Sequence, residues 1–340
     1  MNVKIIFRAV MIKFARGIAL VVSLFFIVPP HAHAKNDHPI QQVIAKKKKK
    51  KQKPVQPEQK PPQPPEPPPA PVQTAPIGLK FHTSEKTLNR MMEIISKREK
   101  GVYLRFGDGD VLLADGDDDS YQMGNASLQS EMGEAFGLNG PNILKCLPLG
   151  CKELGGLEEG MSDGVHARSY GSCIDMLTRV QPIWNAEIED VYSMTALAHT
   201  AIMNPALCIQ FLKFIKQAAP CILVGNCDIP DSVRSMLFGS ECEFIPTPPQ
   251  NSYSEIDRIE QECLEIAKNY QEYTIIVTSM GCSGRALQKR LWHKLDNVFL
   301  FDFGSLMDAI CGWDTRAWIS LTHFSPEDFH ETLEKELGAF

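Results

Sequence analysis

The chain lacks the motifs that mark the common nucleotide-binding and hydrolytic α/β enzymes. Its 340 residues contain no GxGxxG, no GxxxxGK(S/T) and no HExxH. The segment Gly281-Cys282-Ser283-Gly284 differs from GxSxG because its second glycine comes one position too early. A dinucleotide-binding domain, a P-loop NTPase, a zincin and an α/β-hydrolase therefore all lose support.

Cysteine is missing from the first 145 residues. All ten cysteines lie at or beyond Cys146, and no two of them form a CxxC pair. A structural zinc site therefore has little support, because such sites usually take cysteines at short, paired spacing. In an exported chain the cysteines can form disulfides, but their spacing selects no pairing, and we expect most of them to be buried thiols.

Acidic residues are scarce near the N-terminus and abundant elsewhere. Residues 1–76 contain 13 Lys and Arg against 3 Asp and Glu, whereas the remainder contains 22 against 38, so the tail is near +10 and the body near −16. A body this acidic repels phosphates of nucleic acids, which disfavours nucleic acid as a partner. A phosphate-bearing ligand would need a metal ion or a few local arginines.

The N-terminal segment predicts export. Four basic residues precede an apolar run from Gly17 to Val28, which is shorter than the ~20 residues that span a bilayer. Ala32-His33-Ala34 matches the small-x-small cleavage pattern, so residues 1–34 are interpreted as a signal peptide and the protein as periplasmic or secreted. The alternative is an uncleaved anchor that attaches the chain to a membrane; if the segment is misread, the protein is cytoplasmic.

Residues 35–78 predict a disordered, Lys/Pro-rich linker. The lysine run Lys46 to Lys51 is followed by Pro54 to Pro76, a stretch dominated by Pro, Gln and Glu. Such a segment cannot bury a core and favours an extended, polyproline-like conformation. The lysine run can attract an anionic surface, but a solvated spacer is the simpler interpretation.

From Leu79 onward, helix and strand patterns alternate. Ser84 is expected to cap an amphipathic helix that ends by Gly101. Buried strands are predicted at Val102–Phe106, Ile143–Leu147, Cys221–Val224, Thr274–Thr278 and Val298–Phe301, and helices at Ser127–Leu138, Ala206–Gln217, Ser254–Tyr270 and Ser283–Lys294. This alternation predicts an α/β fold with a mainly parallel sheet and helices on both faces. Ligands of such sheets bind at the carboxyl ends of the strands, where RFGDGD falls.

The aspartates around RFGDGD have two interpretations. Asp108 and Asp110, one glycine apart on a predicted strand-ending turn, can chelate one hard divalent ion, while Gly107 lets the backbone approach a ligand. Asp117 and Asp119 lie further along the loop and are interpreted as solvated. The rival interpretation is a solvated acidic turn without any ion.

The order of the motifs resembles a known family. RFGDGD is followed by Gln122 ahead of a helix, VGN at 224–226, IPTPPQNSY at 245–253, VTSMGCSG at 277–284 and FDFGSLMDAICGWDTR at 301–316. This series is similar to that of the GT-D-type glycosyltransferases, a bacterial family with a Rossmann-like fold and a metal-binding D-x-E motif. The resemblance covers roughly residues 82–323, so we expect a GT-D-like domain at 79–323 and a C-terminal helix at 324–340.

The resemblance implies a nucleotide-sugar donor, usually a UDP-sugar, together with Mn²⁺ or Mg²⁺, and a glycan or glycoprotein acceptor. It makes Asp108 and Asp110 the metal ligands and puts Arg105 beside the diphosphate. Asp110 stands where the family usually has glutamate. Because aspartate is one methylene shorter, the ion must move or be held through water.

Further donor-binding residues follow from the same resemblance. Gly281 and Ser283 are expected to offer phosphate contacts at a helix start, although an ordinary strand-to-helix turn is the alternative. Asn251 and Ser252 follow a proline-containing turn, and a purely turn-forming role is their alternative. Asp302 is expected to orient or deprotonate the acceptor, or else to act as a structural cap. The remaining expected binding residues are Gln122, Ser305 and Arg316.

Export conflicts with this function, because nucleotide sugars are made in the cytosol. Either the N-terminal segment is misread, or the protein reaches a compartment that contains donor, or the domain is a non-catalytic exported module that binds nucleotides or carbohydrates. A metal-dependent phosphoester hydrolase is a third functional hypothesis.

Overall fold

The structure is a computed structural model that describes residues 78–149, 173–185, 187–270, 272–315, 318–319, 322 and 324–338. All of them fall within the unit Ala70–Phe340. The predicted signal peptide and all but the last residue of the predicted linker lie outside this part of the chain. Among the described helices, none combines the length and the apolar content needed to cross a membrane.

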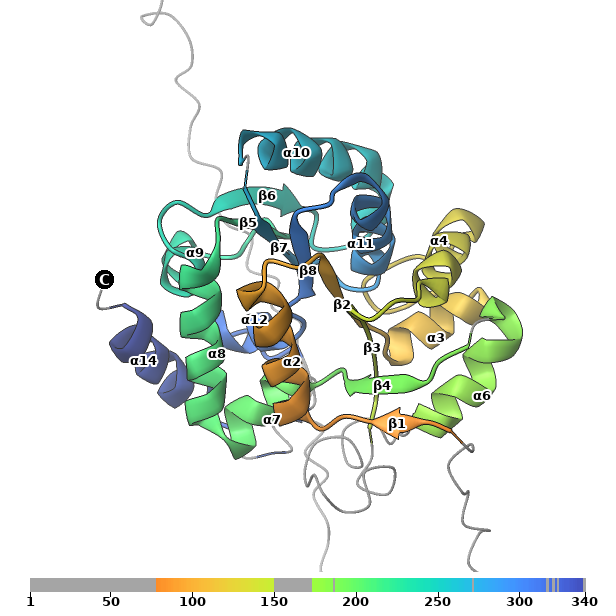
Figure 1. Ribbon diagram of the computed structural model, residues 1–340, viewed down its shortest axis with the longest axis horizontal. Helices are drawn as coiled ribbons and strands as arrows, with labels where there is room; N and C mark the ends of the chain where they lie inside the picture. Colours follow the sequence, from red (N-terminus) through yellow and green to blue (C-terminus); the bar gives the residue numbers. More distant parts are fainter. Residues whose placement is uncertain are drawn as a thin grey trace, which may run out of the picture. The chain divides into compact units, whose positions relative to one another are not determined.

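Eight strands form one sheet in the order β1-β4-β3-β2-β8-β7-β5-β6, and neighbouring strands run parallel (Figure 1). Apolar runs that are buried on both faces form the central strands, as expected for a sheet covered by helices. The strands are β1 (Lys80–Phe81), β2 (Gly101–Arg105), β3 (Ile143–Leu147), β4 (Asp190–Ser193), β5 (Cys221–Asn226), β6 (Glu243–Thr247), β7 (Thr274–Ser279) and β8 (Val298–Asp302).

Helices cover both faces of this sheet, which confirms the predicted α/β class. One face carries α2 (Ser84–Ser96), α7 (Ala196–Met203), α8 (Pro205–Ala218), α9 (Asp231–Phe238), α12 (Leu306–Ile310) and α14 (Pro326–Leu337), packed around one apolar core. The other carries α3 (Asp108–Asp115), α4 (Ala126–Gly137), α6 (Cys173–Trp184), α10 (Ile256–Asn269) and α11 (Ser283–Lys294), packed around a second. A short 3₁₀ helix, η2 (Ser252–Glu255), leads into α10.

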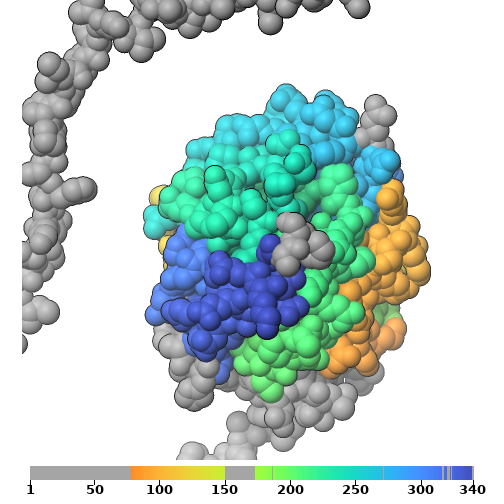
Figure 2. Space-filling view, turned by 90° about the vertical axis from the view of Figure 1, so that its left-hand side faces the viewer, coloured from red at the N-terminus to blue at the C-terminus, as the bar shows by residue number. Residues whose placement is uncertain are grey.

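The last helix, α14, lies on the surface against α8 and α9 (Figure 2, dark blue). Its buried Leu333 and Leu337 face the core, because apolar residues four positions apart share one side of a helix. At its end the Lys216 ammonium donates to the carbonyl of Leu337 at 2.7 Å, and Lys213 pairs with Glu336 at 2.6 Å. Residues 326–337 therefore tie the C-terminal region to the domain.

The sequence predictions differ from the structure at short or half-exposed elements. The cap of α2 is Thr83, whose hydroxyl accepts from the Lys86 N–H at 3.3 Å, whereas Ser84 is buried and bonds Ser193 across the helix–strand interface at 2.9 Å. The sequence does not predict β1, β4 or β6. Two of these strands have four residues or fewer, and β6 is a half-exposed edge strand containing Pro246, so none presents a long apolar run.

The strand order of the sheet reverses its direction between the neighbouring strands β2 and β8. From β2 the sheet extends through β3 to β4 and β1 on one side, and from β8 through β7 to β5 and β6 on the other. In a parallel sheet, the loops that leave two such strands diverge and leave a crevice at the carboxyl edge. Arg105 ends β2 and Asp302 ends β8, so both face that crevice.

Gly101 allows β2 to approach its neighbours closely. A Cβ atom at this position would lie 2.7 Å from Ile94 Cγ2 and 2.8 Å from Phe299 Cδ2. Both side chains are fully buried, so neither can move aside at low cost. The absence of a side chain at this position therefore sets the distance between α2 and the centre of the sheet.

We expect Gly101→Ala to lower the free energy of unfolding by about 1–3 kcal/mol, because the added methyl overpacks the core. Urea titration measures this loss. Gly137→Ala is the matched control: its Cβ meets nothing within 4 Å at the end of α4, so stability should be kept or raised by about 0.5–1 kcal/mol. Similar losses in both variants would contradict the close-packing argument.

Candidate functional site

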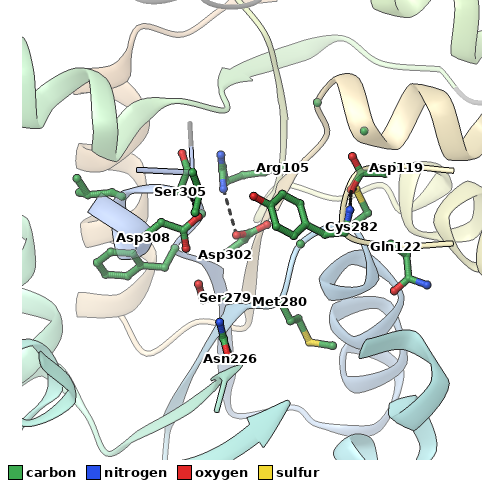
Figure 3. A pocket seen from close by; sticks show the side chains of 18 of the residues that line it. Arg105, Asp119, Gln122, Asn226, Ser279, Met280, Cys282, Asp302, Ser305 and Asp308 are labelled. Atoms are coloured by element: carbon green, nitrogen blue, oxygen red, sulfur yellow. Dashed lines mark hydrogen bonds and ion pairs between the residues drawn. The ribbon is translucent and has the colours of Figure 1, made fainter. Parts of the chain in front are cut away.

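A pocket of about 610 Å³ opens at the carboxyl ends of the strands (Figure 3). Segments that follow β2, β4, β5, β6, β7 and β8 all contribute to its lining. Figure 3 shows Arg105, Asn226 and Asp302, each from the end of a different strand, around this cavity. The volume lies within the ~300–1,000 Å³ typical of small-molecule sites, and the place is the one where such a sheet binds its ligand.

Arg285, in the first turn of α11, joins two buried carboxylates in the pocket wall. Its Nη1 donates to Asp302 Oδ2 at 2.7 Å, and its Nη2 donates to Asp110 Oδ2 at 3.2 Å. Burial alone would lower the pKa of Arg285, but the two carboxylates outweigh this effect and hold that pKa above its ordinary value. A third bond, from Nη1 to the Gly281 carbonyl at 2.7 Å, fixes the guanidinium against the start of its own helix.

Asp110 is buried at the edge of the pocket and is only partly satisfied. One oxygen, Oδ2, accepts from the Gly107 N–H at 2.7 Å as well as from Arg285. The other, Oδ1, is buried without a hydrogen-bond partner in the described part of the chain. Burial raises the pKa of Asp110 to about 6, although Arg285 and the Gly107 N–H act in the opposite direction. An orphaned buried oxygen is costly, so Oδ1 leaves an unused acceptor beside the pocket.

Arg105 is the second arginine that bonds Asp302, and it packs against Gly304. Its Nε donates to the Met194 carbonyl at 2.5 Å, and its Nη1 donates to Asp302 Oδ1 at 3.2 Å (Figure 3). Gly304 has a φ of +68°, and a Cβ there would lie only 1.6 Å from Arg105 Nη1. Gly304 is therefore required both by the backbone conformation and by the guanidinium packed on it.

The expected strand-ending turn at Asp108 and Asp110 is wrong. β2 ends at Arg105, and α3 begins directly at Asp108, with Gly107 as its cap. Carboxylates at this end of a helix are favourable because they face the positive end of the helix dipole. Side chains two positions apart do not share a helix face, and accordingly Asp108 is exposed whereas Asp110 is buried.

The pocket lining supplies some, but not all, of the ligands that a hard divalent ion needs. Asp108 and Asp110 both line the pocket and supply carboxylate oxygens, one of which is the orphaned Oδ1 of Asp110. Oxygen ligands of this kind suit Mg²⁺ or Mn²⁺. Over the described ranges, no three His, Cys, Asp or Glu side chains gather closely enough to hold a metal on their own. An ion at this place would complete its shell with water and substrate oxygens, as Mg²⁺ usually does.

The other predicted site residues divide into those that line the pocket and those that do not. Those that line the pocket are Arg105, Gly107, Gln122, Ser252, Gly281, Asp302 and Ser305. Asn251 and Ser283 instead support its walls: Asn251 Oδ1 accepts from the Met123 N–H at 2.8 Å, and Ser283 Oγ donates to the Met280 carbonyl at 2.8 Å. Arg316 lies outside the described residues.

Several pocket residues were not predicted as site residues. Asp119, expected only as a solvated residue of the loop, is half-buried and lines the cavity, where a Cβ on Gly109 would come within 2.8 Å of its carboxylate. Asn226 ends β5, and the rule that ligands gather at strand ends could have identified it. Arg285 carries no local signal, because its carboxylate partners come from distant parts of the chain, and Asp308 carries none either.

Comparison with known proteins shows the fold. No protein-family model matches the chain, and a search of curated proteins found no match. A glycosyltransferase (DUF1792) from Streptococcus sanguinis is similar in structure, with 19% identity and a TM-score of 0.50 over 65% of this chain and 80% of that one. Two further structures of domain of unknown function 1792, one of them described as a distinct glycosyltransferase fold, are 18% identical with TM-scores of 0.49 and 0.48, over 65% of this chain and 77% of theirs. The likeness to the Streptococcus sanguinis structure confirms the expected GT-D-type fold.

We expect Arg285→Met to lower the free energy of unfolding by about 3–5 kcal/mol, because it leaves two buried carboxylates without their shared cation. Urea titration again gives the measurement. Lys97→Met is the matched control, since Lys97 pairs with Glu93 on the surface of α2 and its side chain is 53% exposed; this change should cost less than about 1 kcal/mol. If the two losses are alike, Arg285 does not hold the site together.

Proposed function

We propose that this protein is a glycosyltransferase that uses a nucleotide-sugar donor, most simply a UDP-sugar, with Mn²⁺ or Mg²⁺. The observation that carries the proposal is the pairing of two helix starts at one pocket: the acidic start of α3 and the start of α11. The first supplies carboxylates for a cation, and the second supplies backbone N–H groups for an anion. The shared fold with a solved glycosyltransferase supports the same reaction class.

The donor diphosphate is proposed to lie between these two helix starts. Gly281 and Cys282 line the pocket at the start of α11, where backbone N–H groups and the helix dipole favour a negative group. Arg105 lines the same cavity and contributes positive charge. The strand ends that carry Asn226 and Thr247 provide further polar groups in the lining, suited to the nucleoside.

Asp108 and Asp110 are the proposed ion ligands. They do not share a helix face, but both line the pocket at the N-terminal end of α3, toward which the Cα–Cβ bonds of a helix tilt, and they would hold the ion there. Asp119 lies beside Gly109 and adds negative charge to the same region. When bound, Mn²⁺ or Mg²⁺ would act as a Lewis acid that neutralises charge on the departing diphosphate.

The acceptor is proposed to enter on the side of the pocket formed after β8. There the half-buried Trp313 offers an apolar ring face, and Asp308 accepts from the Thr315 hydroxyl at 2.7 Å. Both oxygens of Asp302 already accept from guanidinium groups, which supports the orienting role among those predicted for it. Asp308 lies on this side of the lining and is the better placed carboxylate to receive a proton from an acceptor hydroxyl.

In the proposed reaction, an acceptor hydroxyl oxygen forms a bond to the anomeric carbon of the donor sugar. The bond between that carbon and the diphosphate oxygen breaks, and its electron pair leaves with the nucleoside diphosphate. The hydroxyl proton passes to a carboxylate such as Asp308. Positioning and charge stabilisation are what these residues contribute to the rate.

A donor-screening thermal shift assay tests the function. We expect a UDP-sugar and Mn²⁺ together to raise Tm, because a ligand at 100 times its Kd stabilises the folded state by about 2.7 kcal/mol. Slow release of free UDP should accompany the shift even without acceptor. A shift without any UDP release would instead support the non-catalytic binding module, and cleavage of simple phosphoesters would support the hydrolase.

Asp108→Asn should weaken metal-dependent donor binding at least tenfold, or about 1.4 kcal/mol, because it removes one of few charged ligands. Calorimetry with a UDP-sugar, with and without Mn²⁺, measures the affinity. Asp117→Asn is the matched control, since Asp117 is an exposed aspartate of the same segment that does not line the pocket. If Asp117→Asn loses binding and Asp108→Asn keeps it, the ion does not lie at the start of α3.

A further inference from the structure

Two cysteines face each other where β5 and β6 begin. Cys221 is the first residue of β5, and Cys242 immediately precedes β6. Ile222 is in register with Glu243, so one position earlier Cys221 lies opposite Cys242. Adjacent strands lie roughly 4.7–4.9 Å apart, which is inside the roughly 4.4–6.8 Å between Cα atoms that a disulfide requires.

The two side chains lie on the same face of the sheet. Residues in register on parallel strands point to the same side, and both cysteines pack against the apolar core beneath α8 and α9. The Cys221 and Cys242 thiols are near neighbours, and the Cys242 thiol donates to the Glu243 carbonyl at 3.5 Å. Among the described cysteines, no other two occupy facing positions on paired strands.

The two thiols are unequal in a way that suits stepwise oxidation. Cys221 is 4% exposed, whereas Cys242 is partly accessible to solvent. The neighbouring Cys221 thiol, the Leu223 N–H and nearby Arg234 lower the pKa of Cys242 although its partial burial acts in the opposite direction, whereas burial raises the pKa of Cys221. Cys242 is therefore the more reactive nucleophile, with Cys221 positioned behind it as the resolving thiol.

We propose that Cys221 and Cys242 are a redox modification site that closes to a disulfide in the presence of a small disulfide oxidant such as oxidised glutathione. The Cys242 thiolate attacks one glutathione sulfur, which breaks the glutathione S–S bond and releases one glutathione. The Cys221 thiol then attacks the Cys242 sulfur and releases the second glutathione. The two cysteines lose two protons and two electrons, and the oxidant is reduced to two thiols.

This bond would link two strands that reach the pocket. β5 ends at Asn226 and β6 ends at Thr247, and both residues line the cavity. The crosslink would lie where the two strands begin, away from the pocket. It would close a loop of the chain that contains α9 and so reduce the conformational freedom of the unfolded state. The site is independent of the proposed sugar transfer, since neither cysteine lines the pocket.

The test uses the full chain, first reduced and then incubated with oxidised glutathione. After iodoacetamide blocks the remaining free thiols, peptide mass mapping should find the Cys221 and Cys242 peptides joined, with the loss of two hydrogens. The oxidised protein should also have a higher Tm than the reduced protein, and addition of a reductant should reverse the difference.

Two variants serve as controls. Cys242→Ser should abolish both the crosslink and the rise in Tm, while Cys227→Ser, at an exposed cysteine next to the end of β5, should leave both unchanged. Three outcomes would overturn the proposal: both thiols remain open to alkylation, Cys242 stops at the mixed disulfide with glutathione, or Cys242 pairs with a different cysteine.

Discussion

The buried guanidinium of Arg285 is the interaction on which the pocket depends. It brings together the start of α3 through Asp110, the end of β8 through Asp302 and the start of its own helix through the Gly281 carbonyl. A buried charge is tolerated only when it is paired and hydrogen-bonded, so these three segments pack stably against one another only while all partners are in place. One side chain of α11 thus holds together the walls of the crevice between β2 and β8.

Charge balance around this group explains why the pocket favours an ion together with an anionic ligand. Arg105 and Arg285 are matched by Asp110 and Asp302, so the buried network is neutral as a whole. Asp108 and Asp119 add negative charge to the lining, which would repel a diphosphate on its own. A divalent cation would change the sign of that interaction, and Asp110 Oδ1 has no hydrogen-bond partner among the described residues.

The sequence predicts those parts of the fold that depend on local pattern. The apolar runs of β2, β3, β5, β7 and β8 and the periodicity of α11 identify the sheet and its carboxyl edge. α3 is missed because glycine and aspartate at its start are poor helix formers that tertiary contacts override. Arg285 is missed because its partner Asp110 lies 175 residues away, and Asp119 because only the folded chain brings it against Gly109. Long-range pairing of charges leaves no periodic trace in a single sequence.

The compartment links the two chemistries proposed for this protein. Nucleotide sugars are made in the cytosol, where glutathione and thioredoxin keep thiols reduced, so a chain that works there would have donor available and an open Cys221–Cys242 pair. An exported chain would meet an oxidising environment that closes the pair, and it would need donor supplied to it. The redox state of these cysteines in the native protein therefore indicates whether the chain works in the cytosol or is exported, which is the question that the N-terminal segment raises. Neither cysteine lines the pocket, so this indication is independent of donor binding.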